Sequence, residues 1–334
     1  MLTTSASDRQ RRARRTGRQF GPAFSLAALA FAACCGIALS TPYAGDFEEL
    51  GTSARSIGMG GAVVAATFDP SAIYYNPSMT SRIARTAATF LHSEDFSGLL
   101  SHNFLGVSFG TSRQAFGFAV LHNGIPGIKL TKLPSESIPG DTTPPGPNNR
   151  PYVVREVSAN QVVGYVNFAR ALGPHVALGA NAKIIYQDIG VGSCFGMGLD
   201  AGATITPVAD LDVGVRLRNA STSPLFWDTG TREQVLPRAC IGVAKTFRFG
   251  RDRLTLAAEN EADFEGSAFS PNFGVEYAFR NLLHGRLGVY RGNFAFGVGL
   301  RYKRFYVDYG YAAGTAPGAR ELGSPQQVSG GIEF

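Results

Sequence analysis

Charged residues are scarce in this chain: Asp, Glu, Lys and Arg make up only 17% of its 334 residues, against about a quarter in an ordinary soluble domain. Cysteine is scarce too, and its four copies form neither a CxxC pair nor a Cys/His spacing that binds a metal. No Gly-Lys-Ser/Thr follows the glycines, which excludes a phosphate loop. We therefore expect a protein that is not an enzyme, with no metal site and no cofactor.

A surplus of one charge sign is also missing from most of the chain. The formal net charge is +6, but residues 1–44 hold six arginines against the single acid Asp8. The rest of the chain carries 25 basic and 24 acidic side chains. A protein that binds nucleic acid needs a basic face to neutralise phosphates, so the sequence excludes a nucleic-acid partner.

Long apolar runs are missing beyond the first 44 residues, where none reaches the ~18 residues of a membrane helix. The one long run, Phe20 to Leu39, follows the arginines and precedes small residues, which is the order of a secretory signal. We predict that residues 1–44 are a signal peptide, removed after Ser40 or Ala44. Two alternatives stay open: the run remains as a membrane anchor, or Cys34 is a lipoprotein site.

What recurs along the chain is alternation with a period of two. From Leu211 to Arg218 the odd positions are aliphatic and the even ones polar or glycine, and the pattern returns from Phe294 to Tyr302 and from Phe305 to Tyr311. Such alternation indicates strands with one apolar face and one polar or small face. It predicts fourteen strands, near 84–92, 101–111, 113–122, 156–170, 174–188, 194–206, 209–219, 235–248, 252–263, 269–280, 284–292, 293–302, 303–312 and 325–334.

The predicted strands are long, and their connections alternate between short and long, as 111–113 and 123–155 do. Ten residues rising ~3.3 Å each and tilted by ~40° span about 25 Å, the height of the apolar band of an outer-membrane barrel. Such barrels have short turns at one end and longer loops at the other. We expect the Pro- and Gly-rich segment 123–155 to form neither a helix nor a ladder strand, and to act as a lid or to receive a partner.

These features predict an all-β fold: a transmembrane, antiparallel, up-and-down β-barrel of about 14 strands (residues 84–334) in the outer membrane of a Gram-negative-type bacterium. An even strand number places both barrel ends on the periplasmic side, and faces poor in charge but rich in Gly and Ala indicate a filled lumen. We expect residues 45–83 to be an N-terminal hatch or plug inside that lumen. A soluble β-sandwich is the alternative.

Two stretches near the N-terminus resemble the signature of a known family. Residues 51–62, with Gly58, Gly60 and Gly61, and residues 68–77, with Asp69-Pro70 and Asn76-Pro77, are similar to the start of PorV/PorQ proteins. That family belongs to the FadL-like outer-membrane transporters of hydrophobic compounds. The resemblance continues over 212–219, 235–238 and 272–311.

The resemblance implies a fourteen-stranded barrel with a hatch, in which the Asn-Pro turn belongs to the hatch and the substrate leaves sideways through an opening in the wall. The turn reads Asn76-Pro77-Ser78, with serine where the family has alanine. The terminal Phe334, which closes an alternating strand, resembles the signal that the barrel-assembly machinery binds.

The motif residues also have a physical explanation. Gly58, Gly60 and Gly61 allow positive φ and close backbone approach, as a chain folded inside a barrel requires. Asp69 can cap a helix whose first turn tolerates proline. Pro77 then ends that helix, and Asn76 before it is driven out of the helical region. Direct contact of these residues with a ligand, or a gating role, is the alternative.

Two functions of different classes follow. The first is a transporter that passes small hydrophobic molecules across the outer membrane, which requires an apolar pocket between hatch and wall. The second is a PorV-like component of type IX secretion that binds exported proteins at its outer loops. The expected partners are outer-membrane lipid, the barrel-assembly machinery, and either hydrophobic small molecules or secreted proteins.

Some polar residues fall near the loop ends of the predicted strands. His92, His102 and His122 lie on the first three strands, and we expect surface positions for them rather than a metal site. The acidic run Glu259, Glu261, Asp263 and Glu265 is expected to be a solvated loop, with divalent-cation binding as the alternative.

Overall fold

The structure is a computed structural model, and it describes residues 48–95, 98–111, 113–137, 142–263, 270–290, 292–313 and 326–334. The predicted signal peptide with its two cleavage positions, the cysteines within it, and Glu265 lie outside the described residues. No helix among the described residues is long and apolar enough to cross a membrane.

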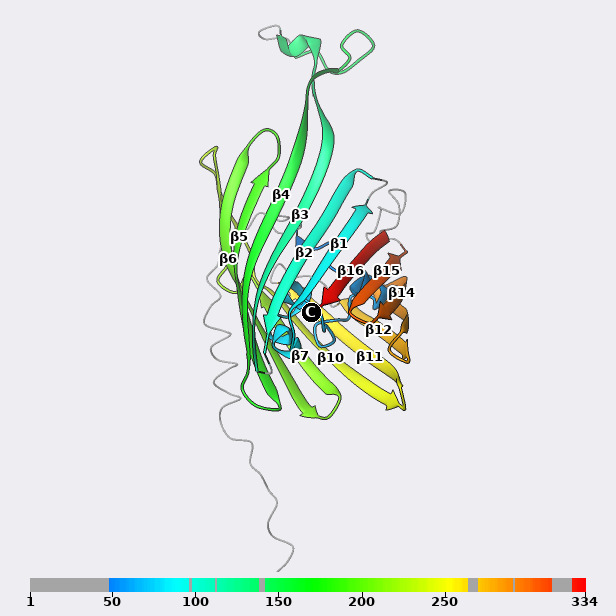
Figure 1. The fold of residues 1–334 in the computed structure, drawn as a ribbon. Helices are drawn as coiled ribbons and strands as arrows, with labels where there is room; N and C mark the ends of the chain where they lie inside the picture. Colours follow the sequence, from blue (N-terminus) through cyan, green and yellow to red (C-terminus); the bar gives the residue numbers. More distant parts are fainter. Residues whose placement is uncertain are drawn as a thin grey trace, which may run out of the picture. The chain divides into compact units, whose positions relative to one another are not determined.

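Fourteen strand positions form a closed antiparallel ring, because β1 pairs with both β2 and β16 and β5 pairs with both β4 and β6 (Figure 1). Fourteen was the predicted number. The strands are β1 (Ala87–Asp95), β2 (Leu100–Gly110), β3 (Gln114–Lys132), β4 (Tyr152–Ala171), β5 (Val176–Asp188), β6 (Ser193–Val208), β7 (Leu211–Arg218), β8 (Ser223–Trp227), β9 (Arg232–Val235), β10 (Arg238–Phe249), β11 (Asp252–Asp263), β12 (Ser270–Phe279), β13 (Leu283–Tyr290), β14 (Asn293–Tyr302), β15 (Phe305–Ala312) and β16 (Gln326–Glu333).

Two of the fourteen positions are each occupied by two consecutive strands: β7 and β8 share one position, and β9 and β10 share the next. Both β7 and β8 pair with β6, β7 along Ala201–Val208 and β8 along Cys194–Gly196. On the other side β7 pairs with β10 and β8 with β9. The hairpin β8–β9 therefore extends the pair β7–β10 toward the loop end, after an interruption of the ladder at residues 219–222 and 236–237. The sequence predicted a loop over 220–234, and this hairpin was missed.

The strands β3 and β4 are much longer than predicted, and the expectation that 123–155 contains no ladder strand is wrong. They pair as far as Lys132 and Tyr152, and they extend beyond their neighbours in Figure 1. The ladder shifts register between Ile125 and Ile128, so Pro126 and Gly127 lie in a bulge. A bulge leaves its extra residue unpaired, so the missing N–H of proline costs no ladder bond there. A short 3₁₀ helix, η3 (Pro134–Ser137), follows β3.

Burial alternates along the strands as the sequence pattern predicts. Of successive residues in β1, β5 and β13, one is buried and the next exposed over most of the length. The exposed positions carry the large apolar side chains, such as Phe116, Phe118 and Val120 on β3. The barrel thus presents an apolar outer surface and directs its small and polar residues inward.

Every connection at one end of the barrel is short, and the longest connections lie at the other end. At the short-turn end β6–β7, β10–β11 and β14–β15 are joined by two residues each. At the other end β3–β4 are joined by residues 133–151, but β13–β14 are joined by only two residues, so the predicted sorting holds for the long connections and not for every loop. Ala87 and Glu333, at the two ends of the ring, pair with each other at the short-turn end, so both barrel ends lie on the same side as predicted.

Three short helices precede the barrel: α2 (Ala54–Gly58), α3 (Ala72–Tyr75) and η2 (Pro77–Arg82). Residues 48–83, here called the N-terminal segment, are almost entirely buried. Helix α2 contacts β13 to β16, and η2 contacts β2 to β6. Val64 lies against Gly214 of β7 and Gly242 of β10. A segment that touches strands all round a closed ring through their inward faces lies within that ring.

Candidate functional site

Hydrogen bonds connect the Asn76-Pro77-Ser78 turn to the barrel wall. The Asn76 amide donates to Val64 O at 2.8 Å and to Thr204 Oγ1 on β6 at 3.2 Å, and its oxygen accepts from Ser78 Oγ at 2.8 Å. Ser78 Oγ also lies 2.7 Å from Thr204 Oγ1. Asn76 has φ −161° and ψ 103°, the extended conformation expected of a residue before proline. One buried amide thus joins two parts of the N-terminal segment to the wall.

Glycines of the wall strands β5 and β6 allow this close approach. A Cβ on Gly202 would lie 2.3 Å from Asn76 Oδ1, and one on Gly179 would lie 2.4 Å from the Pro77 carbonyl carbon. The inward Gly-rich faces, from which the sequence predicted a filled lumen, are therefore places where the backbone of the segment meets the wall.

The three glycines singled out in the sequence have different environments. Gly60 and Gly61 have φ of +61° and +82°. Gly58 does not have positive φ, but a Cβ there would lie 2.9 Å from the Cα of Gly297 on β14. At Gly60 an added Cβ would lie 2.5 Å from Val289 N. Gly60 therefore combines left-handed backbone with direct contact to strand backbone.

Replacing Gly60 by alanine should destabilise the protein by about 3 kcal/mol, since the methyl group would meet strand backbone that has no room to move and would strain a left-handed residue. Gly250→Ala is the matched control: φ is +62° there, but nothing lies within 4 Å of an added Cβ, so the loss should be roughly 1 kcal/mol. The midpoints of unfolding in guanidinium, measured in detergent, compare the two. Equal losses would contradict the packing described for Gly60.

Asp69 lies at the start of the short helical stretch, as predicted, but it is not the N-cap of α3. Its Oδ1 accepts from the backbone N of Ser71 at 2.8 Å, which closes a local turn, and Ser71 itself precedes the helix. The side chain is buried and faces a cavity described below. The helix ends at Tyr75, immediately before Asn76-Pro77.

Ion pairs hold α2 against the strands. Arg55 Nε donates to Glu276 of β12 at 2.9 Å, and Arg286 of β13 reaches the same carboxylate at 2.6 Å and Asp308 of β15 at 2.6 Å. Burial opposes the charge of Arg55, but Glu276, with smaller contributions from Asp69 and Asp308, holds the pKa of Arg55 above its ordinary value. The guanidinium therefore stays charged at every physiological pH.

A second buried cluster holds the beginning of the segment. Lys183 of β5 lies 2.8 Å from both carboxylate oxygens of Glu48 and 3.2 Å from Asp200 of β6. Tyr165 of β4 donates to Glu48 Oε1 at 2.7 Å. The Lys183 side chain has no exposed surface. Asp200 also accepts from Asn219 N at 3.0 Å, at the interruption of the β6–β7–β8 ladder.

Several loop-end residues that the sequence placed on the surface are in fact buried. Glu259 is buried and accepts from Val63 N and Val64 N at 2.8 and 2.7 Å, while the half-buried Glu261 pairs with Arg216 at 3.0 Å. Both acids lie in β11, so the expected solvated loop is wrong for them. His102 is buried against Gly51 O and Asn123, contrary to the surface position expected for it. No group of three His, Cys, Asp or Glu side chains suited to a metal occurs among the described residues.

An apolar cluster lies on the loop side of the segment. It joins Val63, Val64, Ile73 and other segment residues to inward-facing side chains of the wall, namely Leu91, Phe104, Leu121, Val163, Ile185, Leu225 and Val235. Most of these wall residues lie on β1 to β5 at positions that the sequence had assigned to strands, and the hairpin β8–β9 adds Leu225 and Val235.

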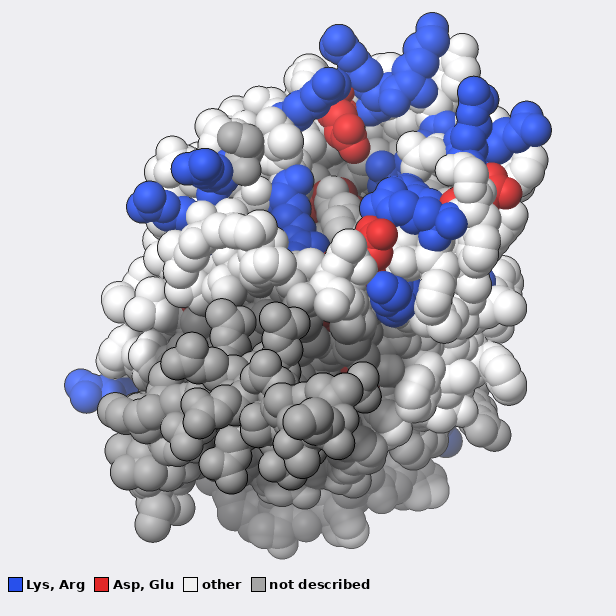
Figure 2. Space-filling view, turned by 90° about the horizontal axis from the view of Figure 1, so that it is seen from below, with Lys and Arg blue, Asp and Glu red and all other residues white. Residues whose placement is uncertain are grey.

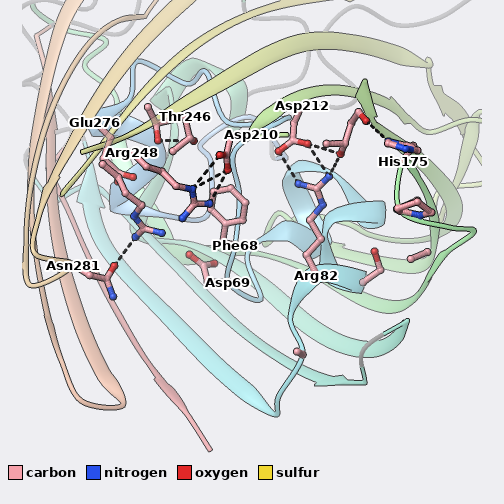
Figure 3. Close-up of a pocket in the computed structure, with 18 of the residues that line it drawn as sticks. Phe68, Asp69, Arg82, His175, Asp210, Asp212, Thr246, Arg248, Glu276 and Asn281 are labelled. Carbon is pink, nitrogen blue, oxygen red and sulfur yellow. Dashed lines mark hydrogen bonds and ion pairs between the residues drawn. The ribbon is translucent and has the colours of Figure 1, made fainter. Parts of the chain in front are cut away.

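A polar cavity of about 760 Å³ lies on the short-turn side of the segment. Figure 2 shows Lys and Arg side chains, with a few acids among them, around a hollow on this face. Arg82 at the end of η2 reaches Asp212 of β7 through two hydrogen bonds of 2.7 and 2.8 Å (Figure 3). The Asp210 carboxylate in the β6–β7 turn accepts from Arg248, which lowers the pKa of Asp210.

Phe334 follows β16. Its side chain is exposed, and its backbone N donates to Thr86 O at 2.8 Å, so the last residue is fixed beside the start of β1.

The class of fold is that of the FadL-like barrels, and solved structures carry the likeness. The Ralstonia pickettii toluene transporter TbuX is 13% identical with a TM-score of 0.55, over 85% of this chain and 98% of its own. The Pseudomonas putida toluene transporter TodX is 12% identical with a TM-score of 0.55, over 84% and 97%. A Pseudomonas aeruginosa FadL homologue is 12% identical with a TM-score of 0.52, over 85% and 98%.

No protein-family model matches the chain, and no curated protein matches it. The structural neighbours therefore support the fold, while the finer resemblance to PorV/PorQ proteins stays a prediction.

Proposed function

We propose that this protein is an outer-membrane channel that passes small hydrophobic molecules. The observation that carries the proposal is the apolar cluster between the N-terminal segment and the wall, inside a barrel whose outer surface is apolar. Soluble proteins rarely expose continuous apolar surface of this extent, and a lipid bilayer covers it without cost. The two toluene transporters with a similar fold, TbuX and TodX, support the same class of substrate.

In this proposal the N-terminal segment is the hatch. It separates the apolar cluster on the loop side from the polar cavity on the short-turn side. A hydrophobic molecule gains little by entering the polar cavity, because the cavity is lined with paired arginines and carboxylates and desolvating those groups is unfavourable. The Asn76-Pro77-Ser78 turn, with Gly58, Gly60, Gly61 and Asp69, fixes the hatch in its closed position.

The interruption of the ladder beside β6 is the proposed exit. Residues Met197 to Asp200 of β6 lie between the parts that pair with β7 and with β8. The wall is closed there by side chains and by single backbone bonds, such as Ala220 N to Leu199 O at 2.7 Å. Side chains can move aside more easily than a continuous ladder can open. Phe334 is proposed to serve assembly, as the terminal residue that the barrel-assembly machinery binds.

Uptake by whole cells tests the proposal. Cells exporting the full chain should take up labelled toluene several-fold faster than cells without it, with no change for labelled arabinose. Leu121→Asn, which places an amide in the apolar cluster, should lower the toluene rate, while Val120→Thr on the outer surface should not. Faster arabinose entry would instead indicate an open pore, and unchanged toluene uptake would refute transport. Among the residues that the structure describes no contact favours the secretion role, and we do not propose it.

A further inference from the structure

The polar cavity at the short-turn end is lined by basic groups of both the hatch and the wall. Its wall includes Arg55, Arg82, Arg248, Arg253, Arg301 and His284. The transport proposal gives this cavity no ligand. What it could bind depends on which of these groups already have a partner of opposite charge.

Most of the charges in the cavity are paired with one another. Arg82 binds Asp212 and Arg248 binds Asp210 (Figure 3). Arg55 binds Glu276. Arg301 has Glu333 at 3.6 Å. The remaining acid, Asp69, accepts from the backbone N of Ser71.

Arg253 of β11 is the exception among the arginines. Among the described residues its guanidinium hydrogen-bonds to the neutral side-chain oxygen of Asn281, in the β12–β13 turn, and forms no ion pair. Arg253 stands directly opposite Arg248 in the β10–β11 register. Like charges placed opposite each other in adjacent strands repel. An anion bound beside Arg253, on the side of β12 and β13, would reduce that repulsion.

His284 of β13 is the second group: it lacks a hydrogen-bond partner among the described residues, and only a protonated ring would form an ion pair, with Glu276. The residue is only 2% exposed, yet neither ring nitrogen has a hydrogen-bond partner among the described residues. The nearest carboxylate oxygen, on Glu276, is 3.8 Å from Nδ1, beyond hydrogen-bond distance. Buried polar atoms in proteins are nearly always satisfied, so an unsatisfied imidazole in a cavity wall points to a missing ligand.

The strand register places these two groups in one row with space between them. Arg253 pairs with Ala278, Ala278 with His284, and His284 with Gly299. All of these positions face inward. Arg253 and His284 are therefore two strand spacings apart, roughly 10 Å between backbones, with only a methyl group between them. The long arginine side chain can cover much of that distance.

We infer that this cavity binds an anionic oxygen group, a carboxylate or a phosphate, between Arg253 and His284. The guanidinium supplies a fork of N–H donors that matches two oxygens of such a group. The imidazole supplies one more N–H donor. The ligand is either a free anion on the periplasmic side or the head group of a lipid. The inference does not depend on hydrophobic transport, and the site would remain if that proposal failed.

Binding to the purified full chain in non-ionic detergent tests the inference by calorimetry. Inorganic phosphate and a short-chain phosphatidic acid are the two probes. Saturable binding of phosphate supports a free anion, and saturable binding of phosphatidic acid alone supports a lipid head group. If neither probe binds saturably, the inference is wrong.

Variants locate the site. Arg253→Gln should weaken binding about tenfold, because the charge-assisted bonds are lost, and His284→Gln should weaken it less. The matched control is Arg251→Gln, which removes an exposed arginine in the same β10–β11 hairpin but outside the cavity wall. It should leave binding unchanged. An equal loss in Arg251→Gln would overturn the assignment in favour of general charge attraction. Unfolding midpoints without ligand verify that each variant is folded.

Discussion

Lys183→Met should be the most destabilising single substitution in the barrel wall, with a loss of about 3–5 kcal/mol, the usual cost of removing one partner from a buried ion pair. The methionine fits the space of the lysine stem but leaves Glu48 and Asp200 without their cation. Both carboxylates are buried. We expect the start of the N-terminal segment to detach, because Lys183 and Tyr165 are the side chains that hold Glu48 by its carboxylate.

The matched control is Arg248→Met. Arg248 also pairs with one carboxylate, that of Asp210, but its side chain is 60% exposed. Exposed pairs contribute about 0–1 kcal/mol. Unfolding in guanidinium and protease sensitivity near residue 48 measure the two effects. The triple variant Lys183→Met/Glu48→Gln/Asp200→Asn should recover much of the loss, since no charge remains buried. A Lys183→Met protein as stable as Arg248→Met would show that the cluster does not hold the segment.

The strands could be predicted closely because their signals are local. The predicted range 252–263 is that of β11 itself, since alternation and a Gly-containing turn fix its ends. Prediction failed where tertiary contacts overrule a local signal. The Pro- and Gly-rich segment 123–155 was expected to contain no ladder strand, but β3 continues through Pro126, which a bulge accommodates. The hairpin β8–β9 was hidden because residues 219–222 interrupt the alternation.

The candidate site was predicted only in outline. The glycines, Asp69 and the Asn76-Pro77 turn could be selected because they match a family signature, and their backbone chemistry gave that match a physical explanation. Their partners could not. Glu48 and Lys183 are 135 residues apart, and no periodicity connects them. The row that joins Arg253 to His284 depends on the register of three strands, which a one-residue slip would destroy.

Locking the hatch to the wall should abolish hydrophobic uptake if the Asn76-Pro77-Ser78 turn must move. Ser78 Oγ and Thr204 Oγ1 are 2.7 Å apart and buried, so cysteines at these two positions bring their sulfurs close to the ~2.05 Å of a disulfide. In a background with Cys194 and Cys240 changed to alanine, Ser78→Cys/Thr204→Cys should lose at least nine-tenths of its toluene uptake after oxidation. A membrane-permeant reductant should restore it.

A second crosslink serves as control for the lock. Thr246 Oγ1 and Thr255 Oγ1 are 3.0 Å apart on the neighbouring strands β10 and β11, so Thr246→Cys/Thr255→Cys joins wall to wall and leaves the hatch free. Its uptake should not depend on oxidation. Full uptake by the oxidised Ser78→Cys/Thr204→Cys protein would mean that the substrate passes while this turn stays on β6. The hatch would then be a fixed wall of the channel, and movement at the β6–β8 interruption alone would have to open the exit.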